Sequence, residues 1–256
     1  MTDSLTSAEA RVADPRLSRL RRVAIVPAYN EAASVGSVIE EIRAVDPELE
    51  VVVIDDGSRD GTSAAAEGAG ARVVRLPFNL GIGGAMQTGY QYAREHGFDL
   101  AIQIDGDGQH DPREVPQLLE PLLAGEADMA VGTRFAGGAR YRPPFARRVG
   151  IEVFARLVTL IVRQRVTDTT SGFRAVNRKG ILLFAADYPH DYPEVETTVL
   201  VFRHSLRMVE VPVAMRTRSS GRSSITLFHS IYYMVKVSLA LFIGLFRRYS
   251  TPTEES

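Results

Sequence analysis

The stretch IQIDGDGQHDP at residues 102–112 joins a short apolar run to two aspartates that stand one residue apart. The run has the composition of a buried β-strand, and it stops at Asp105 and Asp107. Asp-x-Asp at the end of a strand holds two carboxylates close together at a sheet edge, where a divalent cation can bridge them to a diphosphate. Because Asp, Gly and His are also ordinary turn formers, a simple loop remains a second interpretation.

The residues around this stretch alternate short β-branched runs with longer helical patterns. Asp111 and Pro112 have the residue types of an N-cap and first turn, so they mark one helix start. The alternation indicates an α/β fold with a mostly parallel, nucleotide-binding sheet sandwiched by helices. Strands are expected at 23–27, 51–55, 73–76, 100–104 and 129–131, and helices at about 33–45, 61–69, 83–96 and 112–124.

Three of the expected strands end in polar residues. These ends read PAYNE at 27–31, DDGS at 55–58 and DGD at 105–107. In open α/β sheets, ligands bind beyond the carboxyl ends of the strands. The three polar ends are therefore expected to meet at one edge of the sheet and to form the binding site there.

Composition limits the class of protein. With 256 residues, 45% hydrophobic and 24% charged, the chain is typical of one globular catalytic domain. A net charge of -1 gives no reason to expect nucleic acid as a partner. The absence of cysteine excludes disulfides, thiolate zinc sites and a cysteine nucleophile. The first residues show no apolar signal segment, so a cytoplasmic location is expected.

After about residue 140 the pattern changes to longer helical segments, with one more strand expected at 208–213. Residues 145–163 predict an amphipathic helix with a basic face, and residues 225–246 are apolar on nearly all sides of a helix. The expected organisation is a flexible tail at 1–20, a catalytic domain at 21–224, an apolar helix at 225–247 and a tail at 248–256.

Six motifs in order carry a resemblance to a known family. The set resembles the family 2 glycosyltransferases of GT-A fold, and within them the polyprenyl-phosphate sugar synthases of the dolichol-phosphate mannose synthase type. The resemblance covers about residues 22–225 and implies a nucleotide-sugar donor carrying GDP or UDP. The motifs are PAYNE at 27–31, DDGSRDGT at 55–62, NLGIGGA at 79–85, DGDGQ at 105–109, GTRF at 132–135 and TDTTSGFRA at 167–175.

The resemblance implies a donor site at the strand ends. Mg²⁺ or Mn²⁺ would be held by Asp105, Asp107 and Gln109, and it would act as a Lewis acid on the departing nucleoside diphosphate. His110 fits a turn residue better than a metal ligand. Asp55 and Asp56 are also compatible with a plain turn and helix cap. The residues expected to bind the nucleotide are Pro27, Tyr29, Asn30, Glu31, Asp55, Asp56, Asp105 and Arg222, the last in place of a lysine usual in close relatives.

The acceptor side is also implied by the resemblance. A lipid monophosphate has a second pKa of about 6, so it is already largely dianionic at neutral pH and needs cationic clamps rather than a general base. Arginine suits that task because its planar fork matches phosphate oxygens. The clamps are expected at Arg134, Arg148 and Arg174, with Asp107, Arg134 and Arg148 as the catalytic set, while Glu196 is a sugar or acceptor contact or a surface residue.

A polyprenyl chain stays in the bilayer, so such an enzyme is expected to be peripheral on the inner face of the cell membrane. The helix at 225–247 would lie on the surface, span it, or pack on a small membrane protein or a second copy. Three competing functions remain. A transferase acting on a sugar hydroxyl would use Glu196 as its base. A nucleotidyltransferase would carry a Gly-rich basic signature that PAYNEAASVG at 27–36 lacks. The third is a non-catalytic binder.

Overall fold

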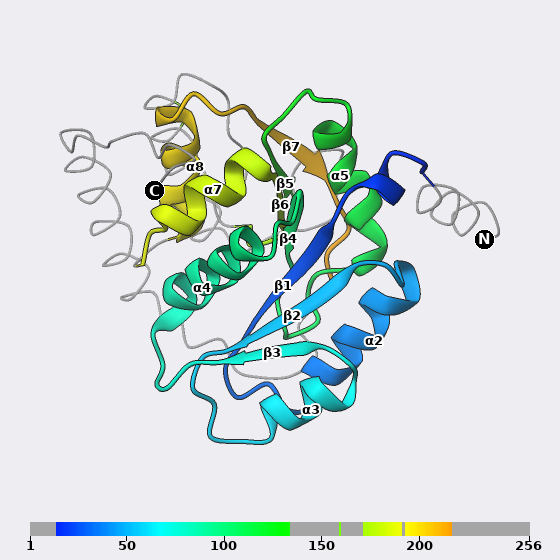
Figure 1. The fold of residues 1–256 in the computed structure, drawn as a ribbon, viewed down its shortest axis with the longest axis vertical. Helices are drawn as coiled ribbons and strands as arrows, with labels where there is room; N and C mark the ends of the chain where they lie inside the picture. Colours follow the sequence, from blue (N-terminus) through cyan, green and yellow to red (C-terminus); the bar gives the residue numbers. More distant parts are fainter. Residues whose placement is uncertain (1–13, 134–158, 160–170, 191–192, 217–256) are drawn as a thin grey trace, which may run out of the picture.

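A seven-stranded sheet forms the centre of the protein, in the order β3-β2-β1-β4-β6-β5-β7 (Figure 1). The computed structural model describes residues 14–133, 159, 171–190 and 193–216. The strand β6 runs antiparallel to β4 and to β5, whereas the other neighbouring pairs are parallel. The strands are β1 (Arg22–Ala28), β2 (Glu50–Asp55), β3 (Arg72–Arg75), β4 (Leu100–Gln103), β5 (Met129–Thr133), β6 (Arg174–Asn177) and β7 (Met208–Pro212).

Helices cover both faces of the sheet and enclose two hydrophobic cores (Figure 1). On one face, side chains from α4 (Gly81–Glu95), α7 (Arg178–Ala186) and α8 (Pro193–Arg203) pack on the sheet. On the other face lie α2 (Val35–Val45), α3 (Thr62–Gly68) and α5 (Val115–Leu123). Two short 3-10 helices, Leu17–Arg19 and Pro112–Glu114, complete the described elements. This arrangement confirms the α/β class and the mostly parallel sheet expected from the sequence.

Strand β6 was not anticipated by the sequence pattern. The strand has only four residues, RAVN, which are polar at both ends, so it shows no strand pattern. It also lies far from β5 in the sequence. The strand nevertheless pairs on both sides, with Gln103 of β4 opposite Arg174. It places the SGFRA motif beside the Asp-x-Asp stretch.

The beginning of the chain also differs from the expected flexible tail over residues 14–20. Leu17 is buried in the core on the α2 and α5 side. Arg16 forms ion pairs with Asp14 and with Glu120 of α5. Burial of one leucine and these contacts hold the segment against the domain. The expected helices at 145–163 and 225–246 lie outside the described residues.

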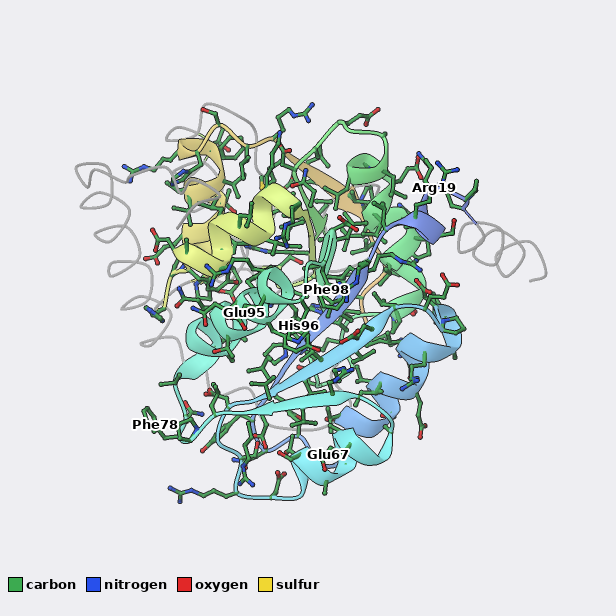
Figure 2. All side chains as sticks on the ribbon, in the orientation of Figure 1. Arg19, Glu67, Phe78, Glu95, His96 and Phe98 are labelled. Atoms are coloured by element: carbon green, nitrogen blue, oxygen red, sulfur yellow. The ribbon has the colours of Figure 1, made fainter. Side chains whose placement is uncertain are left out.

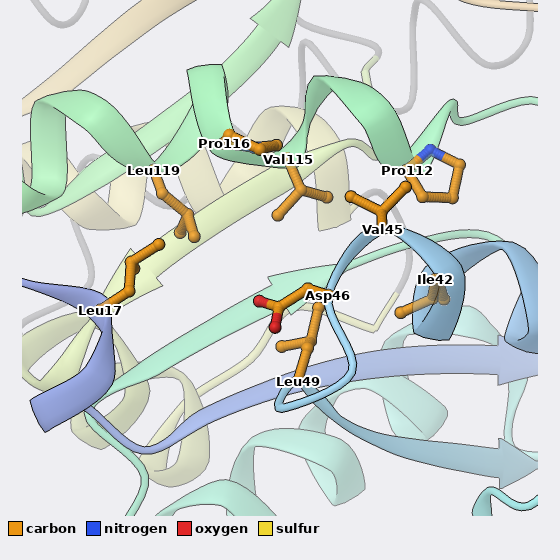
Figure 3. Close-up of a pocket in the computed structure, with 9 residues that line it drawn as sticks. All are labelled: Leu17, Ile42, Val45, Asp46, Leu49, Pro112, Val115, Pro116 and Leu119. Atoms are coloured by element: carbon orange, nitrogen blue, oxygen red, sulfur yellow. The ribbon is translucent and has the colours of Figure 1, made fainter. Parts of the chain in front are cut away.

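A small pocket beneath Leu17 is a packing gap, not a binding site. Its walls are apolar apart from Asp46, and its volume is about 10 Å³, room for no more than a single water (Figure 3). The carboxylate of Asp46 is already paired with Arg22 at 2.7 Å. The chemistry is therefore expected elsewhere, at the carboxyl ends of the strands.

The contact between α4 and β1 gives a test of the packing. A Cβ atom at Gly89 would lie 2.3 Å from Cγ2 of the buried Ile25, so Gly89→Ala should lower the free energy of unfolding by about 1–3 kcal/mol. Urea denaturation measures the change. At Gly68, the last residue of α3, no atom lies within 4 Å of an added Cβ, so Gly68→Ala should be neutral or slightly stabilising. Equal stability of the two variants would contradict the packing.

Candidate active site

A cleft of about 310 Å³ lies at the carboxyl ends of β1, β2 and β4, as expected for an open α/β sheet. This volume is at the lower end of the range for small-molecule sites. Many of the lining residues carry polar side chains, and several follow directly on a strand. The lining residues are Pro27, Ala28, Tyr29, Glu31, Asp56, Asn79, Gly81, Ile82, Ala85, Gln103, Asp105, Gly106, Asp107 and Glu194.

Asp105 and Asp107 both line the cleft, and neighbouring side chains hold them in place. The amide nitrogen of Gln109 donates a hydrogen bond to Oδ2 of Asp107, and its backbone N–H donates to Oδ1 at 3.0 Å. Gln109 is not among the lining residues of the cleft. In this structure Gln109 orients Asp107, and its expected role as a metal ligand stays a prediction.

His110 has the corresponding role at Asp105. Its Nδ1 accepts the backbone N–H of Asp105 at 3.1 Å, so a neutral ring carries its proton on Nε2. That atom faces Oδ2 of Asp105 at 3.6 Å, longer than a hydrogen bond. The ring is buried and stacks on Phe173 with centroids 4.8 Å apart. These contacts make His110 a support of the Asp105 loop, in agreement with the sequence-based choice against a metal ligand.

The donor set of this loop suits a hard divalent cation. Within the described ranges, no group of three or more His, Asp or Glu side chains is arranged to hold a metal by itself. Mg²⁺, however, is commonly held by one or two carboxylates, with substrate phosphates and water completing the shell. Asp105 and Asp107 provide those two carboxylates on one wall of an open cleft, so the residues fit a metal that arrives with a diphosphate.

Asp56 ties the end of β2 to the start of α4. Its Oδ1 accepts the N–H of Leu80 at 2.6 Å, and its Oδ2 accepts the N–H of Gly81 at 2.9 Å. A carboxylate at this position satisfies N–H groups at the helix start, which have no partner within the helix. Asp56 therefore fixes the wall of the cleft that Asn79, Gly81 and Ile82 form.

Gly57 makes the same junction possible. Its φ is +71°, in the region that favours glycine. A Cβ there would lie 2.8 Å from the backbone carbonyl carbon of Phe78. Glycine therefore lets the turn after β2 approach the loop before α4, where Phe78 is 63% exposed and projects from the surface (Figure 2).

Asp55 does not line the cleft, although the sequence predicted it as a nucleotide contact. Its side chain is buried and accepts hydrogen bonds from the backbone N–H of Ser58 at 2.8 Å and from the hydroxyl of Ser63. Burial opposes ionisation, but these hydrogen bonds and the charge of Arg75 outweigh it and lower the pKa of Asp55. The structure gives Asp55 the alternative role, in the turn that ends β2.

The PAYNE motif is divided between the cleft and its support. Pro27, Tyr29 and Glu31 line the cleft, and Tyr29 is 45% exposed. Asn30 instead has a φ of +56°, and its side-chain oxygen accepts the N–H of Arg59 at 2.9 Å. It thus joins the β1 and β2 turns, and its predicted contact with the donor stays a prediction.

Arg174 lies inside the protein, where it does not match the role of an exposed phosphate clamp. Its side chain is 2% exposed, and its guanidinium donates hydrogen bonds to the carbonyls of Ser171 and Glu194 and to the hydroxyl of Thr197. The sequence could not reveal this, because two of the three partners, Glu194 and Thr197, come from α8. Arg174 connects β6 to the start of that helix. The other expected clamps, Arg134 and Arg148, and the donor residue Arg222 lie outside the described residues.

Glu194, rather than Glu196, lines the cleft. Both residues belong to the first turn of α8, and both are half-buried. Burial raises the pKa of Glu194; the positive charge of Arg174 opposes that rise and the carboxylate of Asp105 adds to it. Helical geometry separates the two side chains, so only one of two closely spaced carboxylates can face the cleft.

Gln103 was also missed by the sequence analysis, although a signal for it was present. It is a polar residue inside the apolar run LAIQI, and every residue of β4 is buried. A polar side chain in a buried strand requires a reason, because burying an amide without a partner costs free energy. Asn79, Gly81, Ile82 and Ala85 belong to a motif that was recognised without a role for its residues.

Comparisons with known proteins show the family of this chain. The model of glycosyl transferase family 2 matches residues 23–182. The chain belongs to this family. It is 31% identical to undecaprenyl-phosphate mannosyltransferase of Micrococcus luteus, over 81% of this chain and 88% of that protein. It is 28% identical to polyprenol monophosphomannose synthase of Mycolicibacterium smegmatis, over 80% and 81%.

A solved structure supports the same assignment. Glucosyl-3-phosphoglycerate synthase from Mycobacterium tuberculosis, in complex with Mn²⁺, UDP and phosphoglyceric acid, superposes with a TM-score of 0.66 at 25% identity. The match covers 94% of this chain and 81% of that one. The family expected from the six motifs is confirmed, and this family 2 chain is a glycosyltransferase of GT-A type.

The hydrogen bonds of Asp55 predict a pH-dependent contribution to stability. Because the folded-state pKa is lowered, the ionised carboxylate stabilises the fold above its unfolded pKa of about 3.9, and the effect is lost as pH falls through the folded pKa. Asp55→Asn should therefore lower the free energy of unfolding by about 1–2 kcal/mol at pH 7. Urea denaturation from pH 7 to pH 3 should show this difference shrinking below about pH 4.

The control is Glu67→Gln, which removes an exposed carboxylate on α3 (Figure 2). Its free energy of unfolding should equal that of the wild-type enzyme at every pH. A difference for Asp55→Asn that stays constant down to pH 3 would contradict the role given to the ionised carboxylate.

Proposed function

We propose that this glycosyltransferase moves one sugar from a nucleoside diphosphate to the phosphate of a polyprenyl phosphate, at the cytoplasmic face of the cell membrane. The observation that carries the proposal is the pairing of two features. The cleft places Asp105 and Asp107 beside the strand-end turn of Asp56. Two relatives that align over four fifths of the chain are named for transfer to, or synthesis on, polyprenyl phosphates.

A divalent cation, Mg²⁺ or Mn²⁺, would be held by Asp105 and Asp107, and it would neutralise charge on the departing diphosphate. The residues around the pair keep it ready for that task. Gln109 fixes one carboxylate and His110 supports the loop of the other. These contacts are made by the protein's own residues. The two carboxylates would therefore already be positioned for the cation when the donor binds.

The acceptor phosphate supplies its own nucleophile. With a second pKa of about 6, it is largely dianionic at neutral pH, so no side chain has to remove a proton. One phosphate oxygen attacks C1 of the sugar, and the bond from C1 to the diphosphate oxygen breaks. The nucleoside diphosphate leaves with the electron pair, and the configuration at C1 inverts. We assign the clamping of the acceptor to Arg134 of the GTRF motif and to Arg148 of the basic segment 145–163.

The membrane location follows from the acceptor, whose polyprenyl chain stays in the bilayer. In the part of the chain that the structure describes, no helix is long and apolar enough to cross a membrane. The segment 225–247 and the basic segment 145–163 are the parts we propose to meet the lipid surface or a partner, because of their apolar and basic sequence patterns.

The proposal is tested by incubating the enzyme with a short polyprenyl phosphate, Mg²⁺ or Mn²⁺ and a panel of UDP- and GDP-sugars. Mass spectrometry should find a glycosylated lipid phosphate. Asp107→Asn should lower the rate by at least about 100-fold, because it removes a ligand from the metal that stabilises the leaving group. Asp99→Asn, at the opposite end of β4, should keep wild-type activity. No glycosylated lipid phosphate with any donor of the panel would contradict the polyprenyl acceptor.

A second candidate is transfer to a hydroxyl acceptor, and one observation favours it. Glu194 lines the cleft and burial raises its pKa, which is the direction that makes a carboxylate a stronger general base. Glu194→Gln separates the two candidates. A base for a hydroxyl acceptor would lose about 10²–10⁴-fold in rate. For the phosphate acceptor we expect a loss of less than about 10-fold, because the nucleophile is already ionised.

A further inference from the structure

Gln103 is a buried polar side chain that faces the cleft without a partner. The residue is 4% exposed and belongs to the cleft wall. Among the described residues, no hydrogen bond of its side-chain amide is found, although the amide carries two donors and an acceptor. An amide that has little access to water and makes no hydrogen bond costs free energy in the absence of a ligand. A ligand that offers both a donor and an acceptor would remove that cost.

The amide lies next to the carboxylate of Asp105. The two residues are two positions apart, so along an extended backbone their side chains share a face. Gly172 confirms how close they are. An added Cβ there would lie 3.1 Å from Nε2 of Gln103 and 3.4 Å from Oδ2 of Asp105. Both groups therefore border one small volume, which the glycine leaves open.

The order of the strands in the sheet indicates which part of a bound donor would lie in this volume. The nucleotide side of the cleft is built by the ends of β2 and β1, which carry Asp56 and Tyr29. The next strand is β4 with the Asp-x-Asp pair, followed by β6. A nucleotide sugar is arranged in the same sequence: base, ribose, diphosphate, sugar. With the diphosphate at Asp105 and Asp107, the sugar falls on the side of β6, where Gln103 lies opposite Arg174.

The neighbours of Gln103 do not compete for its amide. Arg174 directs its guanidinium to Ser171, Thr197 and Glu194 instead. On the other side, Gln103 pairs in register with Ile25, whose side chain is apolar. Within the described part of the chain, neither of these neighbours occupies the hydrogen-bonding groups of the amide.

We propose that Gln103 is a specificity-determining residue, which exchanges hydrogen bonds with a hydroxyl of the transferred sugar. A hydroxyl group both donates and accepts, as a primary amide does, so the two groups match. The proposal rests on the proposed use of a nucleoside-diphosphate sugar. It does not depend on the identity of the acceptor. Selection among sugars that differ in one hydroxyl would then depend on a residue of the central strand.

The experiment is a thermodynamic cycle in which one change replaces Gln103 and the other removes one hydroxyl from the donor sugar. The affinity for each donor is measured by calorimetry with Mn²⁺ and without lipid. The donor is whichever of UDP-glucose, UDP-galactose, UDP-N-acetylglucosamine and GDP-mannose binds the wild-type enzyme most tightly. The variants are Gln103→Met, which keeps the length of the side chain, and Gln103→Asn, which keeps its polarity. Gln117→Met is the control, because Gln117 of α5 donates to the carbonyl of Pro212 away from the cleft.

Gln103→Met and Gln103→Asn should each bind the intact donor about 3- to 10-fold more weakly and bind UDP or GDP alone as the wild type does. With donors deoxygenated at single positions, one analogue should be bound equally by wild type and Gln103→Met. Gln117→Met should behave as wild type with every ligand.

Two results would overturn the proposal. One is equal weakening of the nucleotide and the nucleotide sugar in both Gln103 variants, which indicates a general structural role. The other is that Gln103→Met discriminates against every deoxygenated donor as strongly as the wild-type enzyme does. Failure of the proposed acceptor would look different: donor binding would respond to Gln103 as described, while no glycosylated polyprenyl phosphate formed.

Discussion

Strand β4 hydrogen-bonds to β1 on one side and to β6 on the other, and each of its residues is buried. The Asp-x-Asp loop begins where this strand ends, so its position is fixed by the most constrained part of the sheet. Two carboxylates held near one another repel, and a flexible loop would let them separate. A rigid strand with Gln109 and His110 as supports keeps Asp105 and Asp107 on one wall of the cleft.

The acidic residues near the cleft divide into two kinds according to what their oxygens contact. Asp55 and Asp56 accept backbone N–H groups and hold the turn after β2 against the start of α4. Asp105 instead has a side chain that is 34% exposed at the cleft. The sequence presents these pairs as similar polar strand ends. The difference arises because Asp56 accepts N–H groups at the start of α4, whereas the backbone N–H that Asp107 accepts belongs to its own loop.

The inner end of the cleft depends on a contact across the antiparallel strand. Arg174 of β6 hydrogen-bonds to the start of α8 and so determines where Glu194 lies. Gln103 and the open volume at Gly172 lie on the same side. A donor that enters beside β1 and β2 would therefore meet polar groups from two further elements only after passing the metal pair. Under the proposed function, this layout would separate the groups that hold the nucleotide from those that distinguish the sugar.

The sequence by itself determined the α/β class, the positions of most strands along the chain, the family and the Asp-x-Asp pair. These features depend on local periodicity and on motifs that are continuous in the chain. The tertiary structure alone decided that β6 inserts between β4 and β5, that Arg174 is buried, and that Glu194 rather than Glu196 faces the cleft. Those outcomes depend on contacts between residues far apart in the chain, such as Arg174 with Thr197, and no local pattern records such pairing.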